Sequence, residues 1–396
     1  MKNDFQSIRL FLLILFSFGM SLGYTQTYQS GNTYFDNTGF VEYRAGNLPI
    51  IISVPHGGYL EPDSIPNRNC NGCSYLRDSY TQEIGYALYD AFFEATGCYP
   101  HLINNLLHRR KFDANRPIGT AADGNALVKL SWFAYHELID SAKAKVMQDY
   151  GKGIFLDLHG HAHDIQRIEL GYLLSRSELQ LPNAELNTTT YIDESSIKAL
   201  VESNLQALSH SDLLRGDLSF GTLLENKGLA AVPGKLDRFP LSGEAYFSGG
   251  YNTDRHSSKD GGQIDGIQIE MNQNIRFDED ERDELIGHLL QSIIEYVQYH
   301  YFSDFSESFC KSLTTSIQEI EEEEVLVYPN PAQTHLFIRS KSEKLNVEIY
   351  NILGQKVKEV VWTGETLNLN TIRSGSYIIV LKKGGRLILA QRLMIN

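Results

Sequence analysis

Short apolar runs alternate with helical patterns over most of the chain before residue 300. The runs lie near residues 49–54, 99–107, 153–158 and 265–271, and they are rich in the β-branched and aromatic residues that favour strands. Segments with a helical repeat separate these runs. This alternation is typical of a sheet that carries helices on both of its faces.

The segment after Asp78 shows the helical repeat most clearly. Its apolar residues recur at positions i, i+3, i+4, i+7 and i+8, which form one helix face: Ile84, Ala87, Leu88, Ala91 and Phe92. Asp78 and Ser79 stand where an N-cap is expected. Further helices are predicted over 130–150, near 195–209 and over 281–301. We therefore predict an α/β fold with a mixed, twisted sheet between helices.

The first residues have the pattern of a secretory signal peptide. Lys2 and Arg9 precede an apolar run over 10–18, and small residues follow near Ser21. An uncleaved membrane anchor is the alternative, but the run is shorter than the ~20 residues that span a bilayer. We predict that residues 1–25 are removed on export and that no transmembrane segment remains.

The amino-acid composition of the chain changes after residue 305. A polar stretch ends in an acidic run over 318–324, which is typical of a solvated linker, here placed at 306–324. Residues 325–396 read as short alternating strands with turn signals, the pattern of a small all-β sandwich. The catalytic body is accordingly predicted to occupy residues 26–305.

Composition and charge limit the classes of partner. The chain has 396 residues, of which 42% are hydrophobic and 11% aromatic, enough for a packed core. Its formal charge of −14 argues against a nucleic acid or an anionic membrane as partner, because both would need an extended basic face. The simplest interpretation is that this charge keeps the protein soluble.

The four cysteines are compatible with export, which permits disulfides. Four cysteines allow three pairings, of which we favour Cys70 with Cys73 and Cys98 with Cys310. Cys70 and Cys73 also have the spacing of half a zinc knuckle, but the chain has no second close pair. A staple within a loop is therefore the preferred interpretation.

Two of the predicted strands end at a histidine that glycine follows. His56 follows the apolar run of 48–54, and His159 follows that of 153–158. Zinc hydrolases use three protein ligands and leave a fourth position open. Each histidine alone could simply pack at a strand end, but the two similar settings together favour one shared zinc site, with His56 and His159 as ligands.

The third ligand is predicted to be a carboxylate. Asp78 is preferred over Glu61 because it opens a helix after the loop that leaves the His56 strand. The alternative is that Asp78 only caps this helix. Asp157 lies two residues before His159, so both point to the same face of the strand, and Asp157 could orient the imidazole ring.

His161 and His163 follow His159 at alternate positions and continue this spacing into the following loop. We take His161 as a candidate catalytic residue that would hydrogen bond substrate or stabilise an oxyanion. The alternative is that both are solvated loop histidines.

A basic segment and a strand carboxylate complete the candidate chemistry. Residues 109–117 concentrate positive charge after a strand, where a guanidinium suits bidentate capture of a carboxylate; a basic surface loop is the alternative. Glu270 lies within an apolar strand and shares a face with Gln268. Burial near a metal would tune Glu270 as a general base, and an ion pair with an arginine is the alternative. Tyr251 follows two glycines in a predicted substrate-facing loop.

These motifs, in this order, resemble the N-formylglutamate amidohydrolases, which are related in fold to zinc carboxypeptidases. The matching stretches span most of residues 48–300: Val54-Pro55-His56-Gly57-Gly58, Asp78, Asp113-Ala114-Asn115-Arg116-Pro117, Asp157-Leu158-His159-Gly160, Gly249-Gly250-Tyr251 and Ile269-Glu270. The chain differs from the family at Gly160-His161, where Ser-Phe is common. The fold implied is the phosphorylase/hydrolase-like one.

The resemblance implies the same three zinc ligands. It also implies that Asn115 and Arg116 hold a substrate carboxylate and that Glu270 activates water, with Asp113 supporting the site as Asp157 does. N-formylglutamate itself is a cytoplasmic intermediate, whereas an exported enzyme meets other amides, so we carry over the reaction class and not the substrate.

The tail resembles the C-terminal sorting domain of the type IX secretion system. Tyr328-Pro329-Asn330-Pro331, Ile349-Tyr350-Asn351 and a final basic-apolar strand occur in the family's order. The resemblance implies the secretion machinery as a partner and a secreted or cell-surface product. A carbohydrate-binding sandwich is the alternative.

The sequence thus predicts a secreted zinc-dependent hydrolase that cleaves an amide or peptide bond of a carboxylate-bearing substrate. One alternative is a non-catalytic surface protein that keeps a hydrolase fold and binds a partner. Another is an esterase or deacylase of the same fold.

Overall fold

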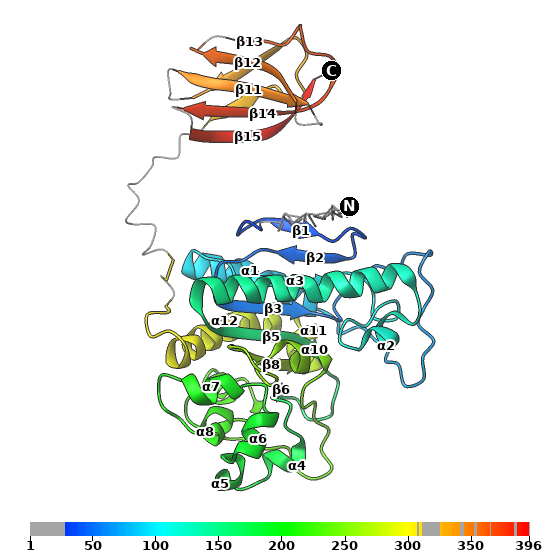
Figure 1. The fold of residues 1–396 in the computed structure, drawn as a ribbon, viewed down its shortest axis with the longest axis vertical. Coiled ribbons are helices and arrows are strands. Elements are labelled where there is room, and N and C mark those ends of the chain that lie inside the picture. The colour runs from blue at the N-terminus through cyan, green and yellow to red at the C-terminus, as the bar shows by residue number, and fades with distance from the viewer. Residues whose placement is uncertain are drawn as a thin grey trace, which may run out of the picture. The chain divides into compact units, whose positions relative to one another are not determined.

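The computed structural model describes residues 28–306, 309–310, 325–340, 344–351, 355–364, 366–383 and 386–395. The predicted signal peptide and the acidic run at 318–324 lie outside these residues. The chain divides into two compact units, Met1–Lys311 and Ser312–Asn396 (Figure 1). In the part of the chain that is described, none of the helices has both the length and the apolar character needed to cross a bilayer.

The first unit is built on an eight-stranded mixed sheet with the order β1-β2-β4-β3-β5-β8-β6-β7. The central neighbours β4, β3, β5 and β8 are parallel, whereas β2 and β6 pair antiparallel with β4 and β8. The strands in chain order are β1 (Thr33–Phe35), β2 (Val41–Arg44), β3 (Ile50–Val54), β4 (His101–Asn105), β5 (Gly153–Gly160), β6 (Ile168–Gly171), β7 (Ala231–Val232) and β8 (Ile264–Met271).

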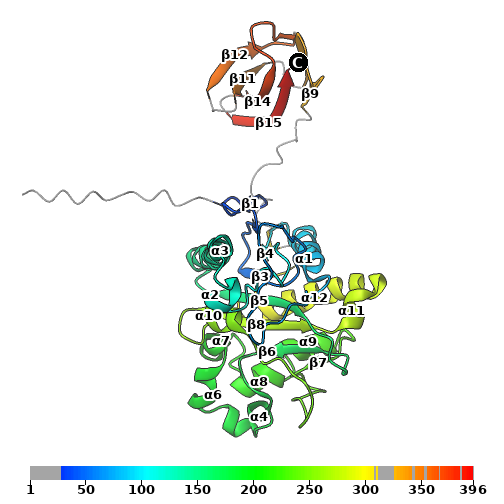
Figure 2. The ribbon, with the colours of Figure 1, turned by 90° about the vertical axis from the view of Figure 1, so that its right-hand side faces the viewer.

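Helices lie on both faces of this sheet, as predicted. Figure 2 shows α1 and α12 on one side of the strands and α3 on the other. The helices are α1 (Thr81–Thr96), α2 (Ile118–Ala122), α3 (Ala126–Tyr150), α4 (Arg176–Leu179), α5 (Asn183–Leu186), α6 (Thr189–Glu194), α7 (Lys198–Ser203), α8 (His210–Arg215), α9 (Phe220–Glu225), α10 (Tyr251–His256), α11 (Gln273–Phe277) and α12 (Glu279–His300).

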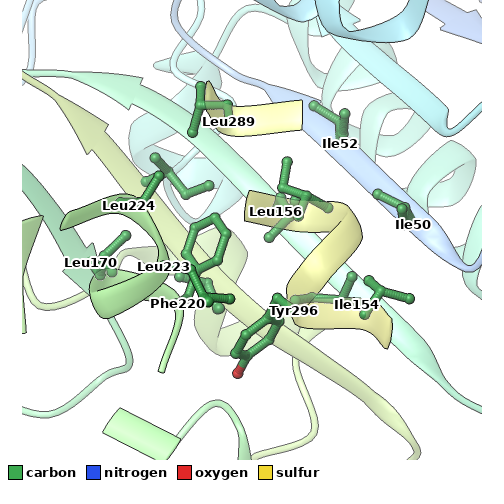
Figure 3. Packing of buried hydrophobic residues seen from close by; sticks show 14 of the residues in the cluster. Ile50, Ile52, Ile154, Leu156, Leu170, Phe220, Leu223, Leu224, Leu289 and Tyr296 are labelled. Carbon is green, nitrogen blue, oxygen red and sulfur yellow. The ribbon is translucent and has the colours of Figure 1, made fainter. Parts of the chain in front are cut away.

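Successive side chains of a strand point to opposite faces of the sheet, which explains why helices cover both faces. Ile50 and Ile52 pack with Leu156 in the core beneath α12, where Leu289 and Tyr296 cover them (Figure 3). The intervening residues Ile51 and Phe155 belong to the opposite core, which α3 covers with Val128, Tyr135 and Ile139. Strands that are apolar at successive positions therefore bury both of their faces.

The connections between the strands change direction at β3. From β3 the chain crosses through α1 to β4 on one side, while β5 lies on the other side of β3 and leads toward β8 and β6. In open α/β sheets, ligands bind where the direction of the connections reverses in this way. His56 follows β3 and His159 lies near the end of β5, so both stand at this point.

The helix predicted near 195–209 is wrong in its length. The structure has only α7 there, because Asn204 ends the helix: its side chain accepts a hydrogen bond from Leu208 N and donates to the carbonyls of Leu200 and Val201. Asparagine competes with the helical backbone in this way. A new helix, α8, begins after Ser209, whose hydroxyl accepts from Asp212 N.

The second unit forms the small β-sandwich that the sequence predicts. One sheet has the order β13-β10-β9 and the other β12-β11-β14-β15. Apolar residues of both sheets, among them Leu336, Val347 and Ile379, form its core. The strands are β9 (Leu326–Tyr328), β10 (His335–Arg339), β11 (Leu345–Asn351), β12 (Lys356–Trp362), β13 (Leu367–Asn368), β14 (Gly375–Lys383) and β15 (Arg386–Ile395).

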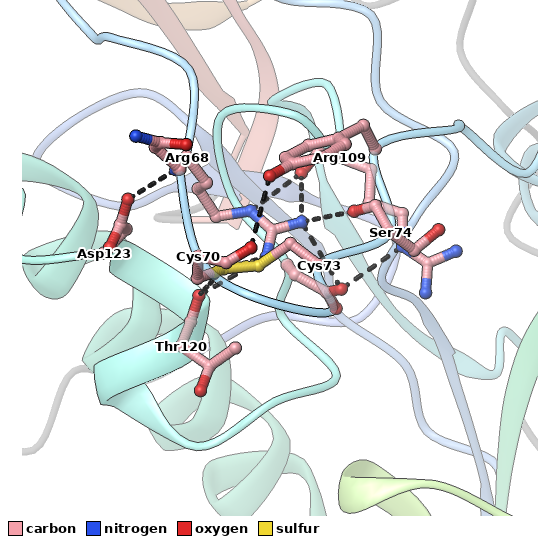
Figure 4. Close-up of a disulfide and its surroundings, with 10 residues drawn as sticks. Arg68, Cys70, Cys73, Ser74, Arg109, Thr120 and Asp123 are labelled. Carbon is pink, nitrogen blue, oxygen red and sulfur yellow. Dashed lines mark hydrogen bonds and ion pairs between the residues drawn. A yellow bond between two sulfur atoms is a disulfide. The ribbon is translucent and has the colours of Figure 1, made fainter.

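Two disulfides staple the first unit, and they are the pairs that the sequence favoured. Cys98 is bonded to Cys310 across 212 positions of the sequence, which ties the segment after α12 to the end of α1. Cys70 is bonded to Cys73 within a loop (Figure 4). The guanidinium of Arg68 fills the inside of this loop and donates to the carbonyls of Ser74, Arg109 and Thr120.

Removing the long-range disulfide should cost more stability than removing the local one. In the chain-entropy account, closing a long loop constrains the unfolded state more than closing a short one. We expect Cys98→Ser/Cys310→Ser to lower the free energy of unfolding by about 2–5 kcal/mol and Cys70→Ser/Cys73→Ser by about 1–2 kcal/mol. Urea unfolding of both double variants measures this, and equal losses would contradict the expectation.

Candidate metal centre

Three predicted ligands from three separate segments meet in space. His56 comes from the end of β3, Asp78 from the loop before α1, and His159 from β5. The Nδ1 atoms of both histidines lie 3.2 Å from Asp78 Oδ2. All three residues are buried, and together they form a group with the geometry to hold one metal ion.

Two carboxylates bind the far sides of the imidazole rings. His56 Nε2 lies 2.6 Å from Asp113 Oδ1, and His159 Nε2 lies 2.8 Å from Asp157 Oδ2. A proton on each Nε2 therefore donates to a carboxylate, which leaves the lone pair of each Nδ1 directed at Asp78. This is the outer layer that metal-binding histidines usually have.

The donor set fits a zinc ion. Because both Nε2 atoms carry a proton, the three atoms that face one another, the two Nδ1 atoms and Asp78 Oδ2, are all hydrogen-bond acceptors. Only a cation or a proton placed among them makes this arrangement favourable. Tetrahedral zinc with ligands at 2.0–2.1 Å would separate them by about 3.3 Å, close to the 3.2 Å observed. Burial disfavours a charged His159, yet Asp157 and Asp78 hold its pKa well above the usual range. The surroundings thus favour positive charge at this point.

Asp78 does not cap α1, so the cap predicted from the sequence is wrong. Tyr80 precedes the helix with φ at 68°, and no side chain caps it. This left-handed residue turns the chain so that Asp78 faces the two histidines. Its carboxylate accepts from Gly160 N and from Arg109 Nη1, both at 3.2 Å. Burial raises the pKa of Asp78, but His56, His159 and Arg109 more than offset this and hold it well below its usual range.

The alternative ligand Glu61 lies outside this group. It is exposed, and its carboxylate lies 3.4 Å from Arg110 Nη1 and 4.0 Å from His108 Nε2.

Glu270 lies beside the candidate ligands on the neighbouring strand. It is the pairing partner of His159 between β5 and β8, and its Oε1 lies 3.9 Å from His159 Nδ1. Gln268 Nε2 donates to Oε1 at 3.0 Å. In the described part of the chain, the ion-pair partner of Glu270 is His159 and not an arginine. Burial raises the pKa of Glu270, and His159 partly opposes the shift.

Asn115, predicted to contact substrate, is engaged by the protein. Its Oδ1 accepts from Asn252 N at 2.7 Å, and its Nδ2 lies 3.3 Å from His159 Nε2. Gly250 must lack a side chain here, since a Cβ would stand 2.5 Å from Asn115 Nδ2. Asn115 thus holds the start of α10 close to His159, and its contact with a substrate carboxylate stays a prediction.

Arg116 and Tyr251 remain available. Arg116 is exposed, with its Nη1 donating to the carbonyl of Asn115 at 2.8 Å. Tyr251 is half-buried at the start of α10 and packs edge-on against His136.

His161 does not present a free ring nitrogen to the centre. Its Nε2 donates to the carbonyl of Arg167 at 2.9 Å, and its Nδ1 accepts from the backbone N of His163 at 3.1 Å. Both ring nitrogens are thus engaged by the backbone of the segment that leads to β6. A contact of His161 with substrate would require one of these hydrogen bonds to break, and its catalytic role stays a prediction.

Residues 326–396 match a protein family, the secretion system C-terminal sorting domain. The chain carries an export domain. The sorting domain belongs to the type IX system and directs the protein to the cell surface or outside the cell. The match coincides with the β-sandwich, so this sandwich is a sorting domain and not the alternative carbohydrate-binding domain. Every residue of the candidate centre lies before it in the sequence.

Some solved structures resemble the chain at low similarity. N-formylglutamate amidohydrolase from Ralstonia eutropha JMP134 is 12% identical with a TM-score of 0.40, covering 65% of this chain and 97% of its own. The gene product Atu2144 from Agrobacterium tumefaciens is 14% identical with a TM-score of 0.40, covering 65% and 94%. No match to a curated protein is significant.

Sequence reasoning missed Arg276, which is buried against the centre. Its guanidinium donates to the backbone carbonyls of Met271, Ser79 and His161. These carbonyls adjoin Glu270, Asp78 and the end of the His159 strand, so one side chain ties the three segments together. Gly160 makes room for it, because a Cβ there would stand 2.3 Å from Arg276 Cζ. An arginine in a short helix gives no sequence signal for this role.

Loss of Arg276 should loosen the centre. Without its guanidinium, three backbone carbonyls each lose a hydrogen bond, and the segments that bear Asp78 and Glu270 lose a common anchor. We expect Arg276→Gln to weaken zinc binding about 10–100-fold, the usual cost of removing an outer support. Gly160→Ala, which displaces the guanidinium, should act in the same direction.

The measurement is a competition titration of zinc against a chelator, with a thermal melt to show that each variant folds. The exposed Arg238→Gln is the matched control. Unchanged zinc affinity in folded Arg276→Gln would contradict the anchoring role.

Proposed function

We propose that the first unit is a secreted zinc-dependent hydrolase of amide or peptide bonds. The observation that carries this proposal is the convergence of His56 Nδ1, Asp78 Oδ2 and His159 Nδ1, with a carboxylate behind each imidazole. Three protein ligands that include two histidines and a carboxylate are typical of catalytic zinc sites, which keep a further position open.

Zinc, when bound, supplies a Lewis acid that polarises a carbonyl group and lowers the pKa of water. The protein supplies the remaining functions. Asp113 and Asp157 orient the imidazoles and keep their protons on Nε2. Arg109, which donates to Asp113 as well as Asp78, fixes both carboxylates at 3.2 Å.

Glu270 is the proposed general base. Its carboxylate stands next to His159, and burial gives it a raised pKa, which makes it a stronger proton acceptor than an ordinary glutamate. It would take the proton of the attacking water on a carboxylate oxygen and pass it to the leaving amine. Arg116 is proposed to hold a carboxylate of the substrate, and Tyr251 to line its approach.

Export determines where such a substrate is found. The sorting domain sends the protein to the surface or beyond, so peptides and related amides outside the cell are the proposed substrates.

Glu270→Gln should abolish turnover and leave zinc binding intact. The amide cannot accept a proton, and a general base contributes about 10²–10⁴-fold to the rate, whereas the three ligands are unchanged. Amide hydrolysis and zinc content are measured on the same preparation. Glu137→Gln, an exposed change on α3, is the matched control. Retained turnover in folded, zinc-loaded Glu270→Gln would exclude this base and favour a binding protein on a hydrolase fold.

Arg116→Ala should slow the cleavage of a carboxylate-bearing substrate and leave the cleavage of other acyl compounds unchanged. Loss of a charge-assisted hydrogen bond costs about 1.5–3 kcal/mol, so kcat/KM for a carboxylate-bearing amide should fall roughly 10–150-fold. The same amide with its carboxylate masked should be cleaved equally by the wild type and the variant. An equal effect on both substrates, or none on either, would count against the clamp and support the esterase or deacylase alternative.

A further inference from the structure

We propose a second cation site next to the candidate centre, formed by His161, His163 and Glu169. The three side chains each offer a ligand atom, and these atoms all lie within 4.8 Å of one another. The proposed ligand is a zinc ion, because two imidazoles and a carboxylate suit borderline transition metals better than calcium or magnesium. This inference does not rest on the proposed catalytic function.

His161 is held in the orientation of a ligand. Its Nε2 donates to the carbonyl of Arg167 at 2.9 Å, which places the proton on Nε2 and the lone pair on Nδ1. A backbone carbonyl behind the ring is a common outer support for a metal-binding histidine. The Nδ1 atom now accepts a 3.1 Å hydrogen bond from His163 N, a bond that a metal ion would replace.

Glu169 brings a buried negative charge that needs a cation. Its side chain is 1% exposed, and it pairs directly with Glu270 between β6 and β8. Like charges opposite each other on neighbouring strands are destabilising. The adjacent Arg167 does not compensate Glu169, because its guanidinium is engaged by Asp237 and Glu244.

In the described residues, the ion-pair partner of Glu169 is His163, with Nδ1 2.8 Å from Oε1. The other carboxylate oxygen accepts from Phe247 N at 2.7 Å, which fixes the carboxylate in place. A metal ion between His161, His163 and Glu169 would balance the charge more fully than one histidine does.

His163 also provides a path for the ion. Its side chain is 22% exposed, whereas the other two members are buried. The ring stacks on Phe247, with centroids 4.7 Å apart, and lies 4.8 Å from the ring of His161. A small rotation of this ring would move its ligand atom, which now lies within 4.8 Å of the other two, toward a shared metal ion.

The test counts zinc ions in the purified full chain at buffered free zinc, by elemental analysis after dialysis. We expect about two per chain in the wild type, one for each cluster. His163→Ala and the isosteric Glu169→Gln should each lose one zinc ion and keep the other. His56→Ala should also keep one, held by the second cluster. His288→Ala on α12 is the matched control and should keep both, and thermal melts establish that every variant is folded.

The outcomes separate the two sites. A single zinc ion in the wild type that His56→Ala removes, and that His163→Ala and Glu169→Gln leave in place, would overturn the second site while supporting the first. Two ions that both survive His163→Ala and Glu169→Gln would overturn it as well. One ion that only the second-cluster variants remove would support this inference and contradict the proposed catalytic centre.

Discussion

The first unit depends on keeping several carboxylates and imidazoles buried together at the carboxyl ends of β3, β5 and β8. Asp78, Asp113, Asp157 and Glu270 are all almost fully buried. Burying such charges is costly unless each is paired or coordinates a cation. The remainder of the site can be understood as the set of contacts that makes this burial possible.

Three arginines support this burial, each in a different way. Arg109 bridges Asp78 and Asp113, so it neutralises both a ligand and the carboxylate behind a ligand. Arg68 lies inside the loop that Cys70 and Cys73 close and stands 3.6 Å from Asp113. Arg276 also binds backbone carbonyls and so fixes the geometry of the segments around the site. The loop disulfide therefore supports the site through Arg68, although it lies outside it.

The glycines of the motifs have a steric explanation. Gly250 allows Asn115 to reach α10, and Gly160 leaves room for the guanidinium of Arg276. Gly160 stands where the resembling family commonly has serine, so this departure is matched by a specific partner in the structure.

The sequence by itself determined the strands and main helices, the export domain and the residue types of the centre. These features are local: period-two and helical repeats, strand ends marked by a histidine and glycine, and the motifs of the tail. The tertiary structure decided what depends on contacts between distant segments. It brought Asp78, for which the sequence offered a ligand or a helix cap, against two histidines, tied Asn115 to the start of α10 and engaged both ring nitrogens of His161. It also introduced Arg276 and Glu169, whose roles arise only where β5, β6, β8 and α11 come together, since no local pattern records which backbone carbonyls or charges will be neighbours.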